Sequence, residues 1–310
     1  PRRAHRPPGV RGSLHTCTEV PYRGPHALRR APLRCIAAPS VQSIDQLYQS
    51  TYDRVAARYD DLWSRHVQTP NDRLTRSMHL RRGERLVDLA CGSGAATLPM
   101  MRLIAPGETV AVDPSEGMLR LAVERAAEEG LHLVPVQSKA EDFIAEAPAH
   151  SFDAVSMRFA LAYLDWSTVL PQIGRLVRPG GRAAILTSLA TSAPQAMQTV
   201  LKFVEHLEIE TEIKPPTPMS AEPVEQLLER GGLSVVESWQ HNFRLWFGSG
   251  VDATRWLLDT GYVTHPAIAA LDPDMKDAMI ELFGSHLEDG FREEDGVPLD
   301  FFVAGVIARR

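Results

Sequence analysis

Residues 86–97 read LVDLACGSGAAT, an apolar run that carries Asp88 and leads into two glycines, Gly92 and Gly94, one residue apart. The apolar run predicts a buried strand, and the glycines predict a tight turn into a following helix. A turn like this can hold the polar end of a cofactor, because its backbone N–H groups are free to donate. Three kinds of nucleotide or nucleotide-containing cofactor can bind to a turn of this type. The residues elsewhere in the chain must therefore show which of the three this turn binds.

The segments after this turn repeat the same unit. Apolar, strand-like runs alternate with helical patterns up to residue 188, and such an alternation predicts a parallel sheet with helices on both faces. Ligands bind these sheets beyond the carboxyl ends of the strands, so the turn after the first strand is expected at the site. Two more strands, the last reading FFVAGVIA, follow after further helical patterns. The strands are expected at 85–90, 109–113, 132–137, 152–158, 182–188, 233–247 and 301–308.

The beginning of the chain differs from the rest. Residues 1–40 contain eight Arg, seven Pro and a single acid, Glu19, with no helical or strand periodicity. We therefore expect residues 1–42 to be a disordered Arg/Pro-rich extension or a transit segment. The protein is then cytoplasmic, or located in a plastid or mitochondrion if the extension is a transit peptide. Residues 43–310 are expected to form one domain, with cap elements at about 43–66, 189–232 and 248–298.

Composition narrows the range of partners. The whole chain has a net charge of −6 although residues 1–40 are strongly basic, so the body of the protein is acidic. An acidic body repels phosphate backbones, and we expect no nucleic-acid partner. No stretch approaches the roughly 18 consecutive apolar residues of a transmembrane segment. The three cysteines lack metal-ligand spacing, so no metal site is expected, and the expected partner is a small molecule.

Two of the three cofactor types fit the glycine turn poorly. A triphosphate-binding loop needs a lysine after its last glycine, and the first lysine of this chain is Lys139. A dinucleotide-binding turn needs a third glycine where this chain has Thr97. Asp113, at the end of the second expected strand, stands where an acid binds a ribose. The dinucleotide alternative is therefore weakened but stays open.

A series of motifs resembles the class I S-adenosylmethionine-dependent methyltransferases. VDLACGSG matches the acid and glycine turn of that family, and AVDPSEGML matches the acidic end of its second strand. SKAEDF, FDAVSMRFALAYL and LVRPGGRAAIL match later motifs in the same order, over roughly residues 45–190. YDRVAARYDDLW is similar to the lid helix of the ubiquinone and menaquinone C-methyltransferase-like small-molecule enzymes. The resemblance implies an α/β fold: a Rossmann-like, seven-stranded, mostly parallel sheet with an antiparallel last strand, helices on both faces and a helical cap.

The resemblance also implies that the chain binds S-adenosyl-L-methionine through these motifs. The turn glycines let the backbone approach the amino-acid tail of the cofactor, and Asp88 is expected to hold its ammonium group. Asp113 is expected to accept hydrogen bonds from both ribose hydroxyls, since a carboxylate offers two oxygens to a vicinal diol. Asp142 is expected at the adenine amino group, with Glu141 as the alternative if the register differs by one. The expected cofactor-binding residues are Tyr59, Asp88, Ala90, Gly92, Gly94, Asp113, Pro114, Met118, Asp142, Phe143 and Arg158.

The sequence leaves the catalytic group and the methyl acceptor open. Methyl transfer needs positioning and exclusion of water, and a general base helps only with some acceptors. The aromatic-rich cap indicates a small, largely apolar acceptor that is methylated at carbon or oxygen. The alternatives are a cyclase or isomerase that binds the same cofactor on the same fold, and an NAD-dependent oxidoreductase. The candidates for a base are His66, Tyr163, His206 and His241.

Overall fold

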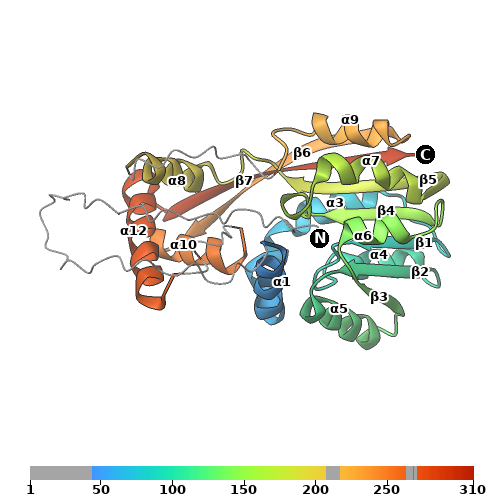
Figure 1. Ribbon diagram of the computed structural model, residues 1–310, viewed down its shortest axis with the longest axis horizontal. Coiled ribbons are helices and arrows are strands. Elements are labelled where there is room, and N and C mark those ends of the chain that lie inside the picture. The colour runs from blue at the N-terminus through green and yellow to red at the C-terminus, as the bar shows by residue number, and fades with distance from the viewer. Residues whose placement is uncertain (1–43, 207–216, 263–267, 269–270) are drawn as a thin grey trace, which may run out of the picture. The chain divides into compact units, whose positions relative to one another are not determined.

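The computed structural model describes residues 44–206, 217–262, 268 and 271–310 (Figure 1). Its centre is a seven-stranded sheet with the strand order β3-β2-β1-β4-β5-β7-β6. The strands are β1 (Arg85–Leu89), β2 (Glu108–Asp113), β3 (Leu133–Gln137), β4 (Phe152–Arg158), β5 (Val177–Ser188), β6 (Ser234–Phe247) and β7 (Val297–Arg309).

The sheet is parallel from β3 to β5 and changes direction at β7. β1 pairs in parallel with β2 and β4, β2 pairs with β3, and β4 pairs with β5. β7 runs antiparallel to both of its neighbours, β5 and β6. The expected seven-stranded, mostly parallel sheet with an antiparallel last strand is confirmed. The five parallel strands therefore present their carboxyl ends at one edge of the sheet.

One face of the sheet is covered by α6 (Ala140–Glu146), α7 (Trp166–Leu176) and α9 (Glu222–Arg230). Val87 and Leu89 of β1 share a buried cluster with side chains of all three helices, because alternate residues of a strand point to the same face. α9 falls in the segment 189–232, which the sequence assigns to the cap. Its Val224, Leu227 and Leu228 nevertheless lie in this cluster, because their helical spacing forms an apolar stripe that packs on the sheet layer.

The opposite face is covered by α3 (Gln68–Ser77), α4 (Thr97–Ile104) and α5 (Glu116–Glu128). Leu86 of β1 lies in one buried cluster with Leu74 of α3 and Met100 of α4. Leu119 and Ala122 of α5 join a second cluster on this side. Both faces of the central strands are thus buried, as is usual for a parallel sheet.

The N-terminal helices and the cap meet in an aromatic cluster. The N-terminal helices are α1 (Ile44–Val55), η1 (Ala56–Arg58), α2 (Tyr59–Leu62) and η2 (Ser64–Val67). β6 and β7 run on from the sheet to the cap helices α8 (Pro194–His206), α10 (Gly250–Asp259) and α12 (Pro273–Phe291) (Figure 1). The indole of Trp256 donates a hydrogen bond to the carbonyl of Leu62 at 2.8 Å. The ring of Trp63 lies 5.6–6.5 Å, between centroids, from Phe159, Phe243, Trp256, Tyr262 and Phe301.

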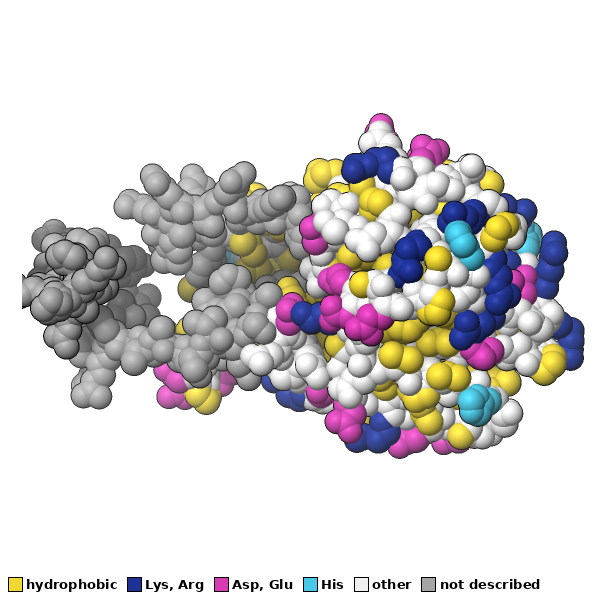
Figure 2. All heavy atoms as spheres, turned by 45° about the vertical axis from the view of Figure 1, so that its right-hand side comes forward, with side chains coloured by type: hydrophobic (Ala, Val, Ile, Leu, Met, Phe, Trp, Pro, Cys, Tyr) yellow, Lys and Arg dark blue, Asp and Glu magenta, His cyan; other side chains and the backbone are white. Residues whose placement is uncertain are grey.

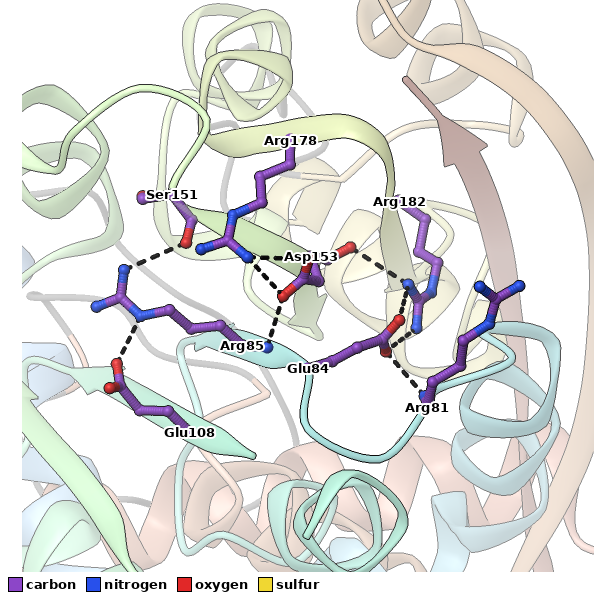
Figure 3. A network of polar contacts seen from close by, with 8 residues as sticks. All are labelled: Arg81, Glu84, Arg85, Glu108, Ser151, Asp153, Arg178 and Arg182. Atoms are coloured by element: carbon purple, nitrogen blue, oxygen red, sulfur yellow. Dashed lines mark hydrogen bonds and ion pairs between the residues drawn. The ribbon is translucent and has the colours of Figure 1, made fainter. Parts of the chain in front are cut away.

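A polar network ties the amino ends of the parallel strands together (Figure 3). Arg182 of β5 donates to Glu84 at 2.9 Å, and both side chains are largely buried. Arg178 donates to the two carboxylate oxygens of Asp153 at 2.9 and 3.1 Å, and Asp153 also accepts the backbone N–H of Arg85 at 2.7 Å. Figure 2 brings this side forward and shows Lys and Arg side chains gathered on it. The network lies at the opposite end of the strands from the glycine turn and stabilises the sheet there.

The expected N-terminal extension, residues 1–42, lies outside the described residues, so its role and the cellular location stay predictions. In the part of the chain that the structure describes, no helix is long and apolar enough to cross a membrane. Helices occupy the other two segments assigned to the cap, at about 43–66 and 248–298.

Candidate functional site

A cavity of about 300 Å³ opens at the carboxyl ends of β1, β2 and β4. The residues that follow these strands line one side, among them Gly92 after β1 and Phe159 after β4. The segments that open α5 and α6 contribute Ser115 and Glu141, and α1 contributes Tyr52. The cavity is therefore at the edge where a doubly wound sheet binds its ligand.

Asp113 ends β2 and lines this cavity with a carboxylate that is held on both oxygens. Oδ2 accepts the backbone N–H of Gly92 at 2.9 Å, and Oδ1 accepts the backbone N–H of Ser115 at 2.9 Å. Each carboxylate oxygen has a further lone pair, so each can accept another hydrogen bond from a ligand. Burial outweighs the two N–H donors and raises the pKa of Asp113 to about 6. The nearby acids Asp88 and Asp53 contribute to this rise.

The backbone at two of the strand ends is strained. Ala90 after β1 has φ +58° and Phe159 after β4 has φ +54°, and both residues line the cavity. A non-glycine residue in this left-handed region costs about 1–2 kcal/mol, and such strain concentrates at functional sites. The left-handed conformation of these two residues turns the chain sharply after each strand, and the two turns form part of the cavity wall.

The two glycines of the turn, Gly92 and Gly94, have different structural roles. Gly92 has φ +55°, lines the cavity and has room beside it, since a Cβ there would meet nothing within 4 Å. Gly94 has φ +79°, and a Cβ there would lie 2.9 Å from Leu98 and 3.0 Å from Ala122 of α5. Gly92 therefore leaves open space for a ligand, whereas Gly94 lets the turn pack closely on two helices.

A smaller cavity of about 70 Å³ shares Gly92 and Arg158 with the larger one. Asp88 lines it and is only 2% exposed, and its Oδ2 accepts a hydrogen bond from the hydroxyl of Thr97 at 2.6 Å. Burial raises the pKa of Asp88, while the charge of Arg158 opposes the rise. The smaller cavity is therefore lined by a buried carboxyl group and a buried guanidinium.

Arg158, the last residue of β4, is a buried cation among neutral acceptors. Its guanidinium donates to the backbone carbonyl of Asn71 at 2.9 Å, to Thr75 at 2.9 Å and to Ser156 at 3.1 Å. Burial lowers the pKa of Arg158 to about 10, against the opposing effect of Asp88, so the group stays charged at neutral pH. A cation in this position suits a ligand that carries an anionic group.

Tyrosines form the side of the larger cavity nearest to α1. Tyr48 and Tyr52 come from α1, Tyr59 opens α2, and Tyr163 ends η3 (Leu161–Tyr163). The hydroxyls of Tyr52 and Tyr163 lie 2.5 Å apart. Burial raises the pKa of all four phenols, that of Tyr163 to about 12. At neutral pH these phenols are hydrogen-bond donors, and Tyr163 is poorly suited to act as a general base.

Three acids hold the N-terminal helices against the rest of the site. Each lies on α1 or α2, and each contacts a residue next to the cavity or in the glycine turn. Together they fix the tyrosines over the strand ends. The contacts, at 2.5–2.7 Å, are Asp45 with Lys139, Asp53 with Ser115, and Asp60 with Ser93 and Arg125.

Comparison with known proteins shows what this core is. Residues 86–181 match the model of a family described as a methyltransferase domain. Residues 86–181 are therefore a methyltransferase domain. Over 161 residues the chain is 30% identical to the demethylmenaquinone methyltransferase of Geobacillus stearothermophilus. Over 136 residues it is 34% identical to the nocamycin O-methyltransferase of Saccharothrix syringae.

These matches cover parts of each protein. They take in 49% and 43% of this chain, and 66% and 48% of the two relatives, which is less than two thirds of either. Among solved structures the cyclase SpnF has a TM-score of 0.57 at 16% identity, over 87% of this chain and 97% of that one. At this identity the structural likeness shows a shared fold.

Most residues expected to bind the cofactor surround the cavities of the methyltransferase domain, but three line neither. Gly94 backs onto α5, and Phe143 packs on Phe152 with ring centroids 6.2 Å apart. Asp142 is exposed, and Glu141 lines the larger cavity in its stead, because successive residues of α6 differ by about 100° in direction. Asp88 lines the smaller cavity. The expected residues that line the larger one are Tyr59, Ala90, Gly92, Asp113, Pro114, Met118 and Arg158.

Two of the three histidines proposed as bases, His66 and His241, do not line the cavities. His66 packs on Trp256 with ring centroids 6.4 Å apart, and burial and Arg65 lower its pKa. His241 stacks on Phe243 at 6.3 Å. The side chain of His206 lies outside the described residues.

Sequence reasoning missed Tyr48 and Tyr52 as site residues. Tyr48 and Tyr52 are four residues apart, and this spacing is the available signal, because such residues share one face of a helix.

Proposed function

We propose that this chain binds S-adenosyl-L-methionine in the two adjoining cavities and methylates carbon or oxygen of a small, largely apolar molecule. The observation that carries the proposal is the carboxylate of Asp113, which lies in the cavity, is fixed to the glycine turn, and has an acceptor site left on each oxygen. The methyltransferase family match and the two relatives, whose names include demethylmenaquinone and nocamycin, support methyl transfer to a small molecule.

The residues around the cavities fit the parts of this cofactor. Asp113 is suited to accept both hydroxyls of the ribose, because its two oxygens match a vicinal diol. Arg158 is suited to bind the carboxylate of the amino-acid end, since its own acceptors among the described residues are neutral. Asp88 is suited to hold the ammonium group, directly or through water. Met118 offers an apolar surface and Glu141 an acceptor for the adenine.

The chain itself contributes positioning and exclusion of water to the reaction. When bound, the cofactor would supply a methyl group on positively charged sulfur; a carbon or oxygen nucleophile can bond to this methyl carbon while the sulfur leaves as a neutral thioether. Tyr52 and Tyr59 present aromatic rings to the cavity, and such rings attract a cation as well as an apolar acceptor. Held over the strand ends by the acids of α1 and α2, they restrict access of water to the reacting atoms.

The residues that could contact the apolar part of the acceptor are not the aromatic residues of the cap, which the sequence had indicated. The aromatic side chains of the cap pack with Trp63 into a cluster of their own. The apolar lining of the cavity comes from the tyrosines, Phe159 and Leu164. An apolar lining with few polar anchors is typical of small-molecule sites, and it supports a small, ring-containing acceptor.

Two measurements test the proposal. Calorimetric titration with S-adenosylhomocysteine and with NADH is expected to show binding of the first and none of the second; the reverse would contradict it and favour the oxidoreductase. Incubation with methyl-labelled S-adenosylmethionine and a set of naphthoquinols and phenols is expected to give labelled product. Consumption of an acceptor to an isomeric, unlabelled product would indicate the cyclase or isomerase instead.

A further inference from the structure

Two phenol hydroxyls meet at the cavity from distant parts of the chain. Tyr52 lies on α1 and Tyr163 ends η3, the short helix after β4, 111 residues further on. Their hydroxyl oxygens are 2.5 Å apart, and either one can be the donor. Both residues line the larger cavity. The pair therefore joins the helix that covers the cavity to the exit of the strand beneath it.

The pair has one more O–H hydrogen than it uses. Two phenols carry two such hydrogens, and a single hydrogen bond between them uses one. In the part of the chain that the structure describes, neither hydroxyl has another hydrogen-bond partner. Burial raises the pKa of both phenols, so both keep their hydrogen at neutral pH. The hydroxyl that accepts within the pair still has its own hydrogen to donate.

We propose that this pair recognises an oxygen of the methyl acceptor, with the accepting hydroxyl donating its remaining hydrogen to a carbonyl or phenolic oxygen of that molecule. The inference rests on the proposed function and narrows its acceptor from any apolar molecule to one that carries such an oxygen. Tyr52 and Tyr163 are then residues that position the acceptor for methylation.

The surroundings of the pair suit an aromatic ring that carries this oxygen. The ring of Tyr48 meets Tyr163 edge to face at 4.7 Å, and that of Tyr59 meets Tyr52 at 5.6 Å. Phe159 adds another apolar side chain to the same cavity. A hydrocarbon of the same shape would bury the remaining O–H without a partner, and an unpaired buried donor is costly. The pair therefore selects for the oxygen while the rings accommodate the carbon skeleton.

The test compares two probes that differ in one carbonyl group, tetralone and tetralin. Protein saturated with S-adenosylhomocysteine is titrated with each probe, and the ratio of the two affinities is measured. The wild-type chain is expected to bind tetralone about three- to tenfold more tightly, the range for one hydrogen bond between neutral groups. The double variant Tyr52→Phe/Tyr163→Phe is expected to bring this ratio close to one. Either single variant leaves one hydroxyl in place, so the single variants show which phenol faces the probe.

Tyr262→Phe is the control, because it removes the same atom from the aromatic cluster around Trp63, where the hydroxyl hydrogen-bonds to Ser192 and does not line the larger cavity. It is expected to keep the wild-type ratio. Equal binding of the two probes by wild-type protein, or an unchanged ratio in the double variant, would overturn the inference. Loss of S-adenosylhomocysteine affinity in the double variant with the ratio intact would assign the pair to the cofactor and overturn it too. Failure of wild-type protein to bind S-adenosylhomocysteine would instead contradict the proposed function.

Discussion

The carboxylate of Asp113 accepts the backbone N–H of Gly92 at 2.9 Å, which fixes the acid that ends β2 to the glycine turn after β1. If both oxygens also accept ribose hydroxyls, Asp113→Ala removes these bonds from the complex. We expect the affinity for S-adenosylhomocysteine to fall by about 1–3 kcal/mol, the range for hydrogen bonds to a charged group. Isothermal titration calorimetry measures the change, and circular dichroism checks that the variant is folded. An unchanged affinity would remove Asp113 from the ribose site.

The same carboxyl predicts a pH dependence of cofactor binding. Because burial raises the pKa of Asp113 to about 6, the ligand-free protein holds a proton on this group below that pH. Ribose hydroxyls bind better to the ionised form, so binding at low pH requires release of this proton. The affinity for S-adenosylhomocysteine is therefore expected to be constant above pH 7 and to fall toward tenfold per pH unit below pH 6. Asp113→Ala should show no such fall, and an equal fall in the variant would assign the effect to another group.

Two adjacent acids of α6 are predicted to differ in their effect on binding. Glu141 lines the larger cavity, whereas Asp142 is exposed. Glu141→Ala is expected to lower the affinity for S-adenosylhomocysteine by about 0.5–1.5 kcal/mol, the contribution of one ordinary hydrogen bond. Asp142→Ala serves as the matched control and is expected to change the affinity little. A larger effect of Asp142 than of Glu141 would restore the assignment made from the sequence.

This pair of acids also shows where sequence reasoning about the site ends. The motif places an acid near the start of α6, but the rotation of the helix decides which of two neighbours faces the cavity. That rotation is set by the packing of Ile144 and Phe143 on the sheet, which involves residues far away in the chain. The meeting of Tyr52 and Tyr163 depends in the same way on how α1 packs on the core. The place of Asp113 at the cavity could be predicted, because a strand end fixes both its position and its direction.

The fold was more predictable than the site, for a related reason. The seven strands are long apolar or alternating runs, so their pattern identifies them without knowledge of their neighbours. α3 was missed because its sequence, QTPNDRLTRS, is mostly polar and buries few side chains. α9 lies in a segment that the sequence assigns to the cap, since periodicity reveals an apolar stripe and not the surface that the stripe covers. The local sequence pattern thus identifies helices and strands, whereas tertiary packing determines which surface each of them covers.

Close packing of the cap helices predicts that substitutions of two glycines of α12 differ in their effect on stability. A Cβ at Gly284 would lie 2.7 Å from the Cα of Val251 in α10, whereas a Cβ at Gly290 would meet nothing within 4 Å. Gly284→Ala is expected to lower the free energy of unfolding by about 1–3 kcal/mol, because α10 and α12 must move apart. Gly290→Ala is expected to leave it unchanged or raise it by up to about 1 kcal/mol, since alanine favours the helix. Urea unfolding of both variants measures the difference, and equal effects would show that the helices do not pack at Gly284.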